Sequence, residues 1–334
     1  QASDAPAPQA VPELPAPQPA PQLAPQPEPE PVPELPEPQP TPIRGGTLRY
    51  GLEADVDGLN PISSVLSAPG QVMANALFDT LAAVTHDGTI VPYLAESWEP
   101  VDGDLATWQV TLRQGVTFHD GTPFDAAAVQ AGFQAQFDSP LIGFGLRPFY
   151  PAENATEVID EFIIQYNLLD SNAQFPATLS TQGGYIASPT WLAAALLDPA
   201  LNQAPVGTGP FKIESRTVDS VTRVVRNDDW WGGDVYLDAI EFVPISDPDT
   251  RTDLLNNGDL QAIQTTNPAS IIDLQADDGI TNVVDTSGEE SFVMLNASRP
   301  PFDDLRVRQA LTLATPLRAY RNLIALGVAP DANQ

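Results

Sequence analysis

The residues best suited to general acid–base chemistry are the chain's two histidines, His86 and His119. A hydrolase would need one of them beside a nucleophile and an orienting group. Each histidine is instead followed directly by Asp and Gly. Because Asp side chains bond the backbone of tight turns and Gly tolerates positive φ, this pattern is typical of a hairpin turn. We therefore expect turn-forming roles for both histidines, no catalytic residue and no enzymatic activity.

Metal and nucleotide sites have little support in the sequence. The chain has no cysteine, and its two histidines lack the spacing of metal ligands. Three acidic pairs are more typical of a solvated surface than of calcium ligands: Asp228-Asp229, Asp277-Asp278 and Glu289-Glu290. The run at 207–209 is Gly-Thr-Gly, but it lacks the Lys and Ser or Thr of a phosphate loop and precedes a predicted strand. We expect no cofactor, no metal and no nucleotide.

Charge and composition narrow the class of protein. The 334 residues carry a formal net charge of -30 at pH 7 with only 14 Lys and Arg. Because nucleic-acid phosphates are bound by Lys and Arg, this balance argues against nucleic-acid partners. A hydrophobic fraction of 42% allows one or two sizeable cores. Apolar runs in the sequence are far shorter than a transmembrane helix requires.

Residues 1–42 consist mainly of Ala, Pro, Gln and Glu. Such a segment buries too little apolar surface to offset the entropy of ordering, so we predict that it is disordered. Its dense proline favours extended polyproline II, and hence a spacer over a solubilising tail.

The elements that position any site follow from hydrophobic periodicity. Residues 205–233 organise the chain: a stiff Gly-Thr-Gly-Pro corner leads into one strand, and alternation at 220–226 predicts a second. We expect this hairpin to connect two lobes and a new sheet to begin at residue 236. Other strands are predicted at 46–53, 107–113, 156–169, 236–245, 260–264, 280–284 and 291–296. Helices are predicted at 67–83, 125–137, 175–181, 189–197, 249–256, 267–276 and 304–314.

Six motifs occur in a fixed order along the chain: GGTL (45–48), LAESW (94–98) with TLRQGV (111–116), FHDGTPF (118–124), VGTGPF (206–211), NDDWWGG (227–233), and PPFDD (300–304) with VRQA (307–310). Together they resemble the family 5 extracellular solute-binding proteins, the peptide and nickel receptors of bacterial ABC importers. The resemblance implies an α/β, two-lobed periplasmic-binding-protein-like fold of class II type, with mixed sheets and flanking helices.

The resemblance also implies a domain organisation and partners. Residues 1–42 would be a linker, 43–235 lobe I including the hairpin, and 236–334 part of a lobe II that is incomplete, because family chains continue further. We expect a monomer in the periplasm or on the outer face of the cytoplasmic membrane, held by a lipid anchor before Gln1. Its partners would be a small-molecule or peptide ligand and the permease subunits of an ABC transporter.

Candidate ligand-binding residues come from the same resemblance. They lie after the first strand, in the 183–185 segment and at the end of the 291–296 strand: Tyr50, Glu53, Asp55, Gly184, Tyr185 and Asn296. Tyr50 has an equally good alternative as a residue of the strand core.

Arg147 is a further candidate, in a loop that also contains Phe144, Phe149 and Tyr150. A guanidinium can pair with a ligand carboxylate through two hydrogen bonds, although a loop arginine is more often solvated. Trp230 and Trp231 could stack on a ligand, but the matching aromatic turn is mainly structural in the family.

The function implied by the resemblance is capture of an oligopeptide or similar small solute by hinge closure, followed by delivery to a membrane permease. The solute could be a peptide, a nickel complex, an opine or a sugar. The alternative is a surface-displayed structural or partner-binding fragment without a complete ligand cleft.

Overall fold

The computed structural model describes residues 42–284, 294–324 and 326. By its internal contacts, the chain from Pro42 onward forms one compact unit. Within the described part, no helix has the length and apolar character needed to cross a membrane. Residues 1–41 of the segment predicted to be disordered, and residues 291–293 of the strand predicted at 291–296, lie outside the described residues; residues 294–296 are described and are not in a strand.

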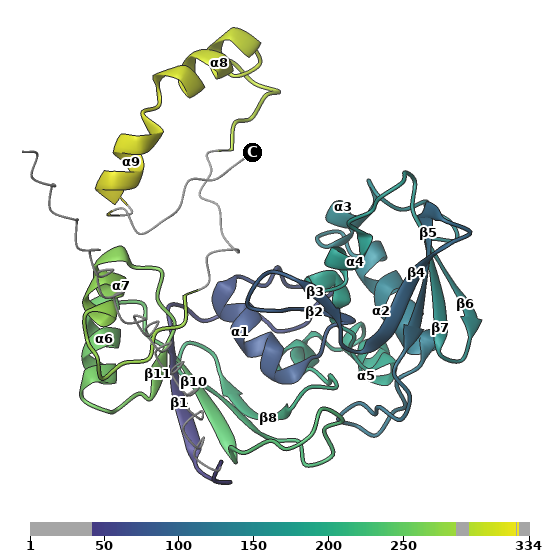
Figure 1. The fold of residues 1–334 in the computed structure, drawn as a ribbon, viewed down its shortest axis with the longest axis horizontal. Coiled ribbons are helices and arrows are strands. Elements are labelled where there is room, and N and C mark those ends of the chain that lie inside the picture. Colours follow the sequence, from purple (N-terminus) through teal and green to yellow (C-terminus); the bar gives the residue numbers. More distant parts are fainter. Residues whose placement is uncertain (1–41, 285–293, 325, 327–334) are drawn as a thin grey trace, which may run out of the picture. The chain divides into compact units, whose positions relative to one another are not determined.

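A mixed five-stranded sheet contains the first strand of the chain. Strand β1 (Thr47–Leu52) pairs in parallel with β10 (Ala239–Pro244) on one side and β11 (Ala262–Ile263) on the other. β10 then pairs antiparallel with β9 (Val221–Arg226), and β9 with the edge strand β8 (Phe211–Thr217). The order is β11-β1-β10-β9-β8, and Figure 1 shows the early β1 beside the late β10.

The predicted hairpin at 205–233 is confirmed as β8 and β9, but the prediction that a new sheet begins at residue 236 is wrong. Both β10 and β11 add to β1, and helix α6 (Pro248–Asn256) connects them. Strand β10, helix α6 and strand β11 thus form a parallel β-α-β unit, and β1 lies between its two strands. A boundary at residue 235 would therefore divide one hydrogen-bonded sheet, and the division into lobes 43–235 and 236–334 stays a prediction.

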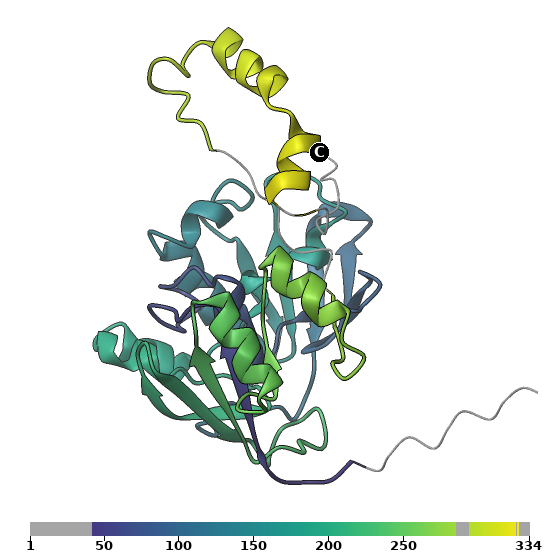
Figure 2. The same ribbon diagram turned by 90° about the vertical axis from the view of Figure 1, so that its left-hand side faces the viewer.

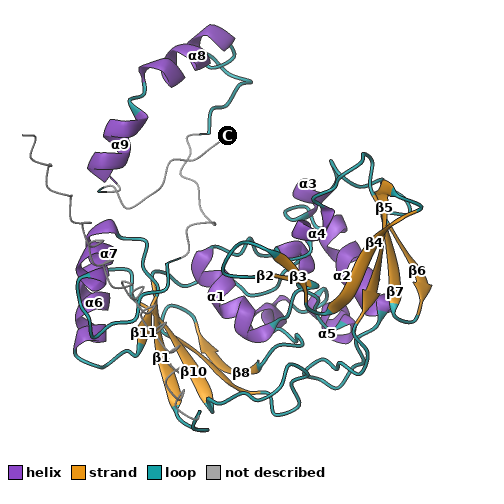
Figure 3. Ribbon diagram, in the orientation of Figure 1, coloured by secondary structure: helices purple, strands orange, loops and turns teal. Residues whose placement is uncertain are grey.

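A second, antiparallel sheet has the strand order β4-β5-β7-β6. Its strands are β4 (Ala95–Val101), β5 (Asp104–Leu112), β6 (Thr156–Asp160) and β7 (Ile163–Asn167), and a separate hairpin joins β2 (Ala82–Val84) to β3 (Ile90–Pro92). Figure 3 shows the strands of both sheets in orange. The predicted strands at 107–113 and 156–169 are confirmed.

Helix α2 (Ala126–Asp138) packs on this second sheet. Asp125 caps it as predicted, because its Oδ1 accepts a hydrogen bond from Ala128 N at 2.8 Å. The predicted core residues Val129, Phe133 and Phe137 are buried, in one cluster with residues of β5 and β7. Periodicity therefore identified both the helix and its buried face.

Helix α1 (Ala68–Leu77) packs on the first sheet in a second core cluster. It begins after Ser67 as predicted but ends at Leu77 instead of 83, because residues 82–84 form β2. Met73 and Leu77 are buried with Leu52 of β1 and Phe242 of β10.

Of the remaining helices, α3 (Gly143–Leu146), in a segment predicted as a loop, and α9 (Leu317–Ile324) were not predicted, whereas the others lie close to predicted positions. Helix α3 lies between β5 and β6 in sequence. Helices α4 (Phe175–Thr178) and α5 (Pro189–Ala195) lie between β7 and β8, with 3-10 turns at Gln182–Gly184 and Pro199–Gln203. After β11 come α7 (Pro268–Gln275), α8 (Leu305–Ala314) and α9 (Leu317–Ile324). Figure 2 shows α6 and α7 side by side. The strand predicted at 280–284 is wrong: residues 281–284 have no regular secondary structure, and Val283 and Val284 are 94% and 58% exposed.

Both His-Asp-Gly segments are turns, as predicted. The side chains of Asp87 and Asp120 accept from the backbone N of Thr89 and Thr122, and the following glycines have φ of 81° and 84°. His119 also forms hydrogen bonds to the corner at 207–210, which the sequence did not predict. Its backbone N donates to Gly207 O at 2.9 Å, and its Nε2 lies 3.0 Å from Gly209 O. Burial lowers the pKa of His119 to about 4, so the neutral ring donates from Nε2.

Glycine is needed at positions 207 and 209 because the backbone at the end of α1 approaches closely. A Cβ on Gly207 would lie 2.2 Å from Leu77 O, and one on Gly209 would lie 2.5 Å from Leu77 C. Neither residue has positive φ. The corner therefore fits directly against the end of α1.

Candidate functional site

The carboxyl ends of the three parallel strands form a polar edge. Glu53 directly follows β1, Ile245 follows β10, and residues 264–266 follow β11. Helices α6 and α7 both begin just after this edge. Because loops and helix N-termini converge there, the carboxyl edge is where open α/β sheets usually bind ligands. We take it as the candidate site and call it the β1 edge.

Glu53 is the acidic residue of the β1 edge. Its Oε1 accepts from Thr266 N at 2.5 Å and from Arg251 Nη2 at 3.1 Å, and its Oε2 accepts from Thr266 Oγ1 at 2.9 Å. The side chain is 23% exposed. Since each carboxylate oxygen has two lone pairs, Oε2 keeps one acceptor position that no described residue occupies. The carboxylate is thus fixed in orientation and still able to accept from a ligand.

The buried side chain of Arg251 forms hydrogen bonds to residues at the ends of all three parallel strands. It extends from α6 with 1% exposure, and its guanidinium donates to Ile245 O, Glu53 and Thr265 Oγ1. Burial lowers the pKa of Arg251, with Glu53 acting against the shift, but an arginine stays charged at neutral pH. Its Nε and the Oε1 of Gln264 are each buried without a hydrogen-bond partner among the described residues.

Asp55 fastens the loop after β1 to the β8–β9 turn. Its Oδ1 lies 2.9 Å from Arg216 Nη2, and its Oδ2 accepts from Asp219 N at 2.6 Å. The two side chains are only 8% and 2% exposed. Both oxygens of Asp55 therefore have protein partners, and its predicted contact with a ligand stays untested.

Tyr50 lies in β1 with its ring centroid 6.0 Å from that of Phe242. It is half-buried, and burial raises its pKa. The structure thus shows the packing expected of a strand core residue, which was one of the two alternatives. Contact with a ligand stays a prediction.

Gly184 and Tyr185 lie in the interior. A Cβ on Gly184 would lie 1.8 Å from Leu179 O, so only glycine fits there. Tyr185 is 5% exposed, its hydroxyl donates to Asn75 Oδ1 at 2.5 Å, and burial raises its pKa to about 12. This segment holds the 3-10 turn against α1.

Arg147 and Asn296 have local partners. Arg147 Nη2 donates to the backbone O of Phe137 and of Ser139, both at 3.1 Å, so the cation satisfies carbonyls at the C-terminus of α2. Asn296 Oδ1 accepts from Ser298 N at 3.0 Å within a turn. Of the predicted site residues, Tyr50, Glu53 and Asp55 share one strand end. No hydrogen bond among the described residues joins Arg147, Gly184, Tyr185 or Asn296 to them.

Sequence reasoning missed the buried carboxylate of Asp79, which is 2% exposed. Its Oδ2 accepts from Trp231 Nε1 at 2.7 Å, Trp230 Nε1 at 3.2 Å and Thr208 Oγ1 at 3.0 Å. Desolvation raises the pKa of Asp79, and these hydrogen bonds oppose the rise. A signal was present in the Trp pair, because buried indole N–H groups require an acceptor. The contacts agree with a structural role for both tryptophans.

Among the solved structures that share this fold are two in complex with peptides. The periplasmic binding protein DppA from Helicobacter pylori, in complex with the peptide STSA, has a TM-score of 0.71 at 26% identity, covering 85% of this chain and 59% of its own. The oligopeptide-binding protein AppA from Bacillus subtilis, in complex with a nonapeptide, has a TM-score of 0.71 at 23% identity, covering 87% and 58%. The fold is therefore that of the periplasmic binding proteins, with mixed α/β sheets and flanking helices, as predicted.

The family model "Bacterial extracellular solute-binding proteins, family 5 Middle" matches residues 89–334, and the chain belongs to this family. Di/tripeptide-binding protein 2 of Pseudomonas aeruginosa is 29% identical over 298 residues, covering 83% of this chain and 56% of the relative. Glutathione-binding protein GsiB of Salmonella paratyphi A is 29% identical over 265 residues, covering 78% and 51%. The chain spans about half the length of these curated relatives. Both relatives are named as binding proteins.

Proposed function

We propose that this protein captures a short peptide outside the cytoplasm and passes it to the permease of an ABC importer. Family membership supports solute binding in general. Several relatives are di/tripeptide-binding proteins, which supports a peptide as the solute. A monomeric state, a location in the periplasm or on the outer face of the membrane, and a lipid anchor belong to the same proposal.

The observation that carries the proposal is the oriented, partly exposed carboxylate of Glu53 at the β1 edge. Thr266 and Arg251 hold its position, while Oε2 keeps an open acceptor position. A peptide presents main-chain N–H donors and a cationic amino terminus, and a charge-assisted hydrogen bond to a fixed carboxylate suits both.

Hinge closure is the mechanism that this site would serve. The β1 edge is built on a hydrogen-bonded sheet and tied by a buried arginine, so it can act as the rigid half of a cleft. A ligand that makes further contacts only when the second half closes shifts the population toward the closed form. The closed form is then the state that the permease recognises.

The test is titration calorimetry and thermal unfolding with free dipeptides and tripeptides, their N-acetylated forms, glutathione, nickel–histidine and mannopinic acid. Free peptides should bind and raise the melting temperature. Glu53→Gln should weaken peptide binding at least about tenfold, since hydrogen bonds to charged groups contribute about 1.5–3 kcal/mol. Asp234→Asn, at an exposed ion pair with Arg44, is the matched control and should leave affinity unchanged.

Absence of binding by every peptide would overturn the proposal and favour the partner-binding fragment. Selective binding of glutathione, the nickel complex or the opine would replace the solute class. Peptide binding that is indifferent to Glu53→Gln would remove the β1 edge as the contact while leaving peptide capture in place.

A further inference from the structure

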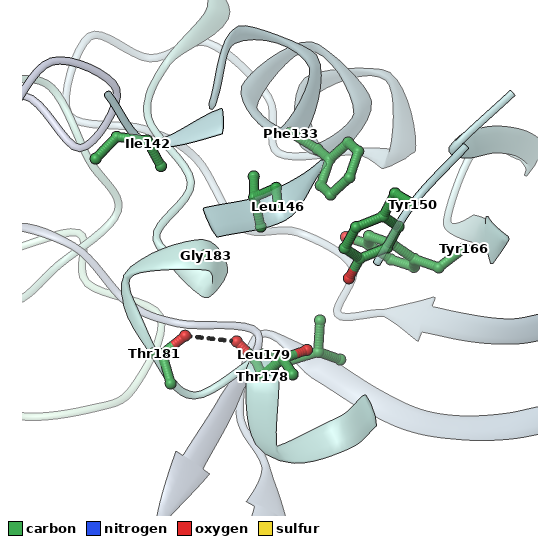
Figure 4. Close-up of a pocket in the computed structure, with 9 residues that line it drawn as sticks. All are labelled: Phe133, Ile142, Leu146, Tyr150, Tyr166, Thr178, Leu179, Thr181 and Gly183. Atoms are coloured by element: carbon green, nitrogen blue, oxygen red, sulfur yellow. Dashed lines mark hydrogen bonds between the residues drawn. The ribbon is translucent and has the colours of Figure 1, made fainter. Parts of the chain in front are cut away.

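A small cavity lies between α2, α3 and α4, and none of its lining residues belongs to the β1 edge. Its volume is about 100 Å³. The side chains of Phe133, Ile142, Leu146 and Leu179 form its apolar walls, and Figure 4 shows them around the space. The cavity is separate in sequence from everything that the proposed peptide site uses.

The polar side-chain groups of this cavity are four hydroxyls. The threonine hydroxyls already donate to the protein, from Thr178 Oγ1 to Phe175 O at 2.7 Å and from Thr181 Oγ1 to Thr178 O at 2.8 Å. The other two belong to Tyr150 and Tyr166, whose hydroxyl ends lie on the side that faces the threonines in Figure 4. Tyr150 and Tyr166 are 7% and 2% exposed.

No hydrogen bond joins the hydroxyl of Tyr166 to another of the lining residues drawn in Figure 4. A buried hydroxyl without a partner is costly, so native structures usually supply one from water or a ligand. Burial raises the pKa of both tyrosines, that of Tyr150 to about 12, so both stay protonated and able to donate at neutral pH. A group in the cavity that accepts from Tyr166 would complete its hydrogen bonding.

Size and charge restrict the occupant. An apolar cavity of about 150 Å³ holds benzene, so this smaller one suits a molecule of about four or five heavy atoms. None of the lining side chains is charged, and a charged ligand would lose its hydration without compensation. Water alone would meet mainly apolar walls.

We propose that this cavity binds a short uncharged aliphatic alcohol, with its hydrocarbon part against Phe133, Leu146 and Leu179 and its hydroxyl paired with Tyr166. The alcohol oxygen accepts from the tyrosine, and its own proton is donated to a free lone pair of a threonine hydroxyl. This site is independent of peptide capture.

Saturation-transfer NMR titrations with n-butanol and n-butyl chloride test the assignment on the full chain. The two probes are similar in shape, and only the alcohol can pair with Tyr166. Tyr166→Phe should weaken n-butanol about fivefold, the value of one hydrogen bond, and change n-butyl chloride less than about twofold. Leu146→Phe should block both probes by filling the space. Tyr236→Phe, at a tyrosine that is 42% exposed and outside the cavity, should change neither.

Several results would overturn the proposal. Equal weakening of both probes by Tyr166→Phe would show that the hydroxyl is not the contact, and retained binding in Leu146→Phe would place the alcohol elsewhere. No saturable binding of n-butanol would leave ordered water as the occupant. If Tyr166→Phe does not fold by circular dichroism, Leu146→Phe alone decides the location.

Discussion

Replacing Asp55 by Ala should destabilise the protein by about 3 kcal/mol, because the change leaves a buried guanidinium without its carboxylate. Arg216 is 2% exposed, and the pair with Asp55 spans 2.9 Å. Removing one member of a buried pair costs about 3–5 kcal/mol. The lower end applies here, since Arg216 keeps neutral acceptors in Gln203 Oε1 and Thr222 Oγ1, both at 2.6 Å.

The assay is urea unfolding followed by circular dichroism, with thermal unfolding alongside. A loss of about 3 kcal/mol corresponds to a fall of roughly 6–12 °C in melting temperature for a domain of this size. Asp234→Ala is the matched control: its pair with Arg44 spans 2.8 Å, but the side chains are 68% and 54% exposed. The control should lose at most about 1 kcal/mol.

The double variant Asp55→Ala/Arg216→Met should recover part of the loss, because it removes the uncompensated charge as well. Equal losses for Asp55→Ala and Asp234→Ala would refute the reasoning. They would mean that burial of the pair does not decide its contribution to the free energy of unfolding.

Three further predictions concern other positions. Because burial raises the pKa of Asp79 above 3.8, its protonated form favours folding, and that contribution is complete below pH 3.8 and lost as pH rises through the raised pKa. The side chain introduced by Asp79→Asn cannot ionise. The free energy of unfolding of this variant, measured by urea titration, should therefore rise relative to that of the natural protein as pH rises through that window. A difference between the two free energies that stays constant with pH would contradict this. Gly184→Ala should cost more than about 3 kcal/mol, since the new Cβ meets a backbone oxygen at 1.8 Å, whereas Gly145→Ala has open space and should be neutral or stabilising; equal unfolding midpoints would count against the clash. Arg147→Ala should lower stability by about 1 kcal/mol by freeing helix carbonyls and leave peptide affinity in calorimetry unchanged; a large loss of affinity would restore its predicted role as a ligand contact.

Local sequence signals predicted most elements of the fold and not the way the sheets are assembled. Asp125 and the four-residue repeat at Val129, Phe133 and Phe137 act within one helix, so their pattern was sufficient. The pairing of β10 with β1 depends on strands far apart in sequence. Nothing in residues 236–245 indicates whether this strand joins the sheet that contains β1 or begins a new sheet.

The candidate site was predictable to a similar degree. The strand end carrying Glu53 and Asp55 could be located by resemblance, but the partners that occupy these carboxylates could not. Arg216 is 161 positions from Asp55, and Arg251 is 198 positions from Glu53. Such long-range partners decide which acidic residue keeps an open acceptor position. Local composition contains no information about them.

The parallel pairing of β1 also affects how the chain can fold during synthesis. Gly46, just before β1, bonds Asp238, a residue 192 positions later. At about 5–20 residues per second, a ribosome needs on the order of 10–40 s to complete that interval. The antiparallel sheet, with all its strands within residues 95–167, can form during this time, while the first strand of the nascent chain waits without either neighbour. Until translation passes Ile263, this strand therefore lacks both of its parallel partners, and its unpaired backbone groups can pair with another chain.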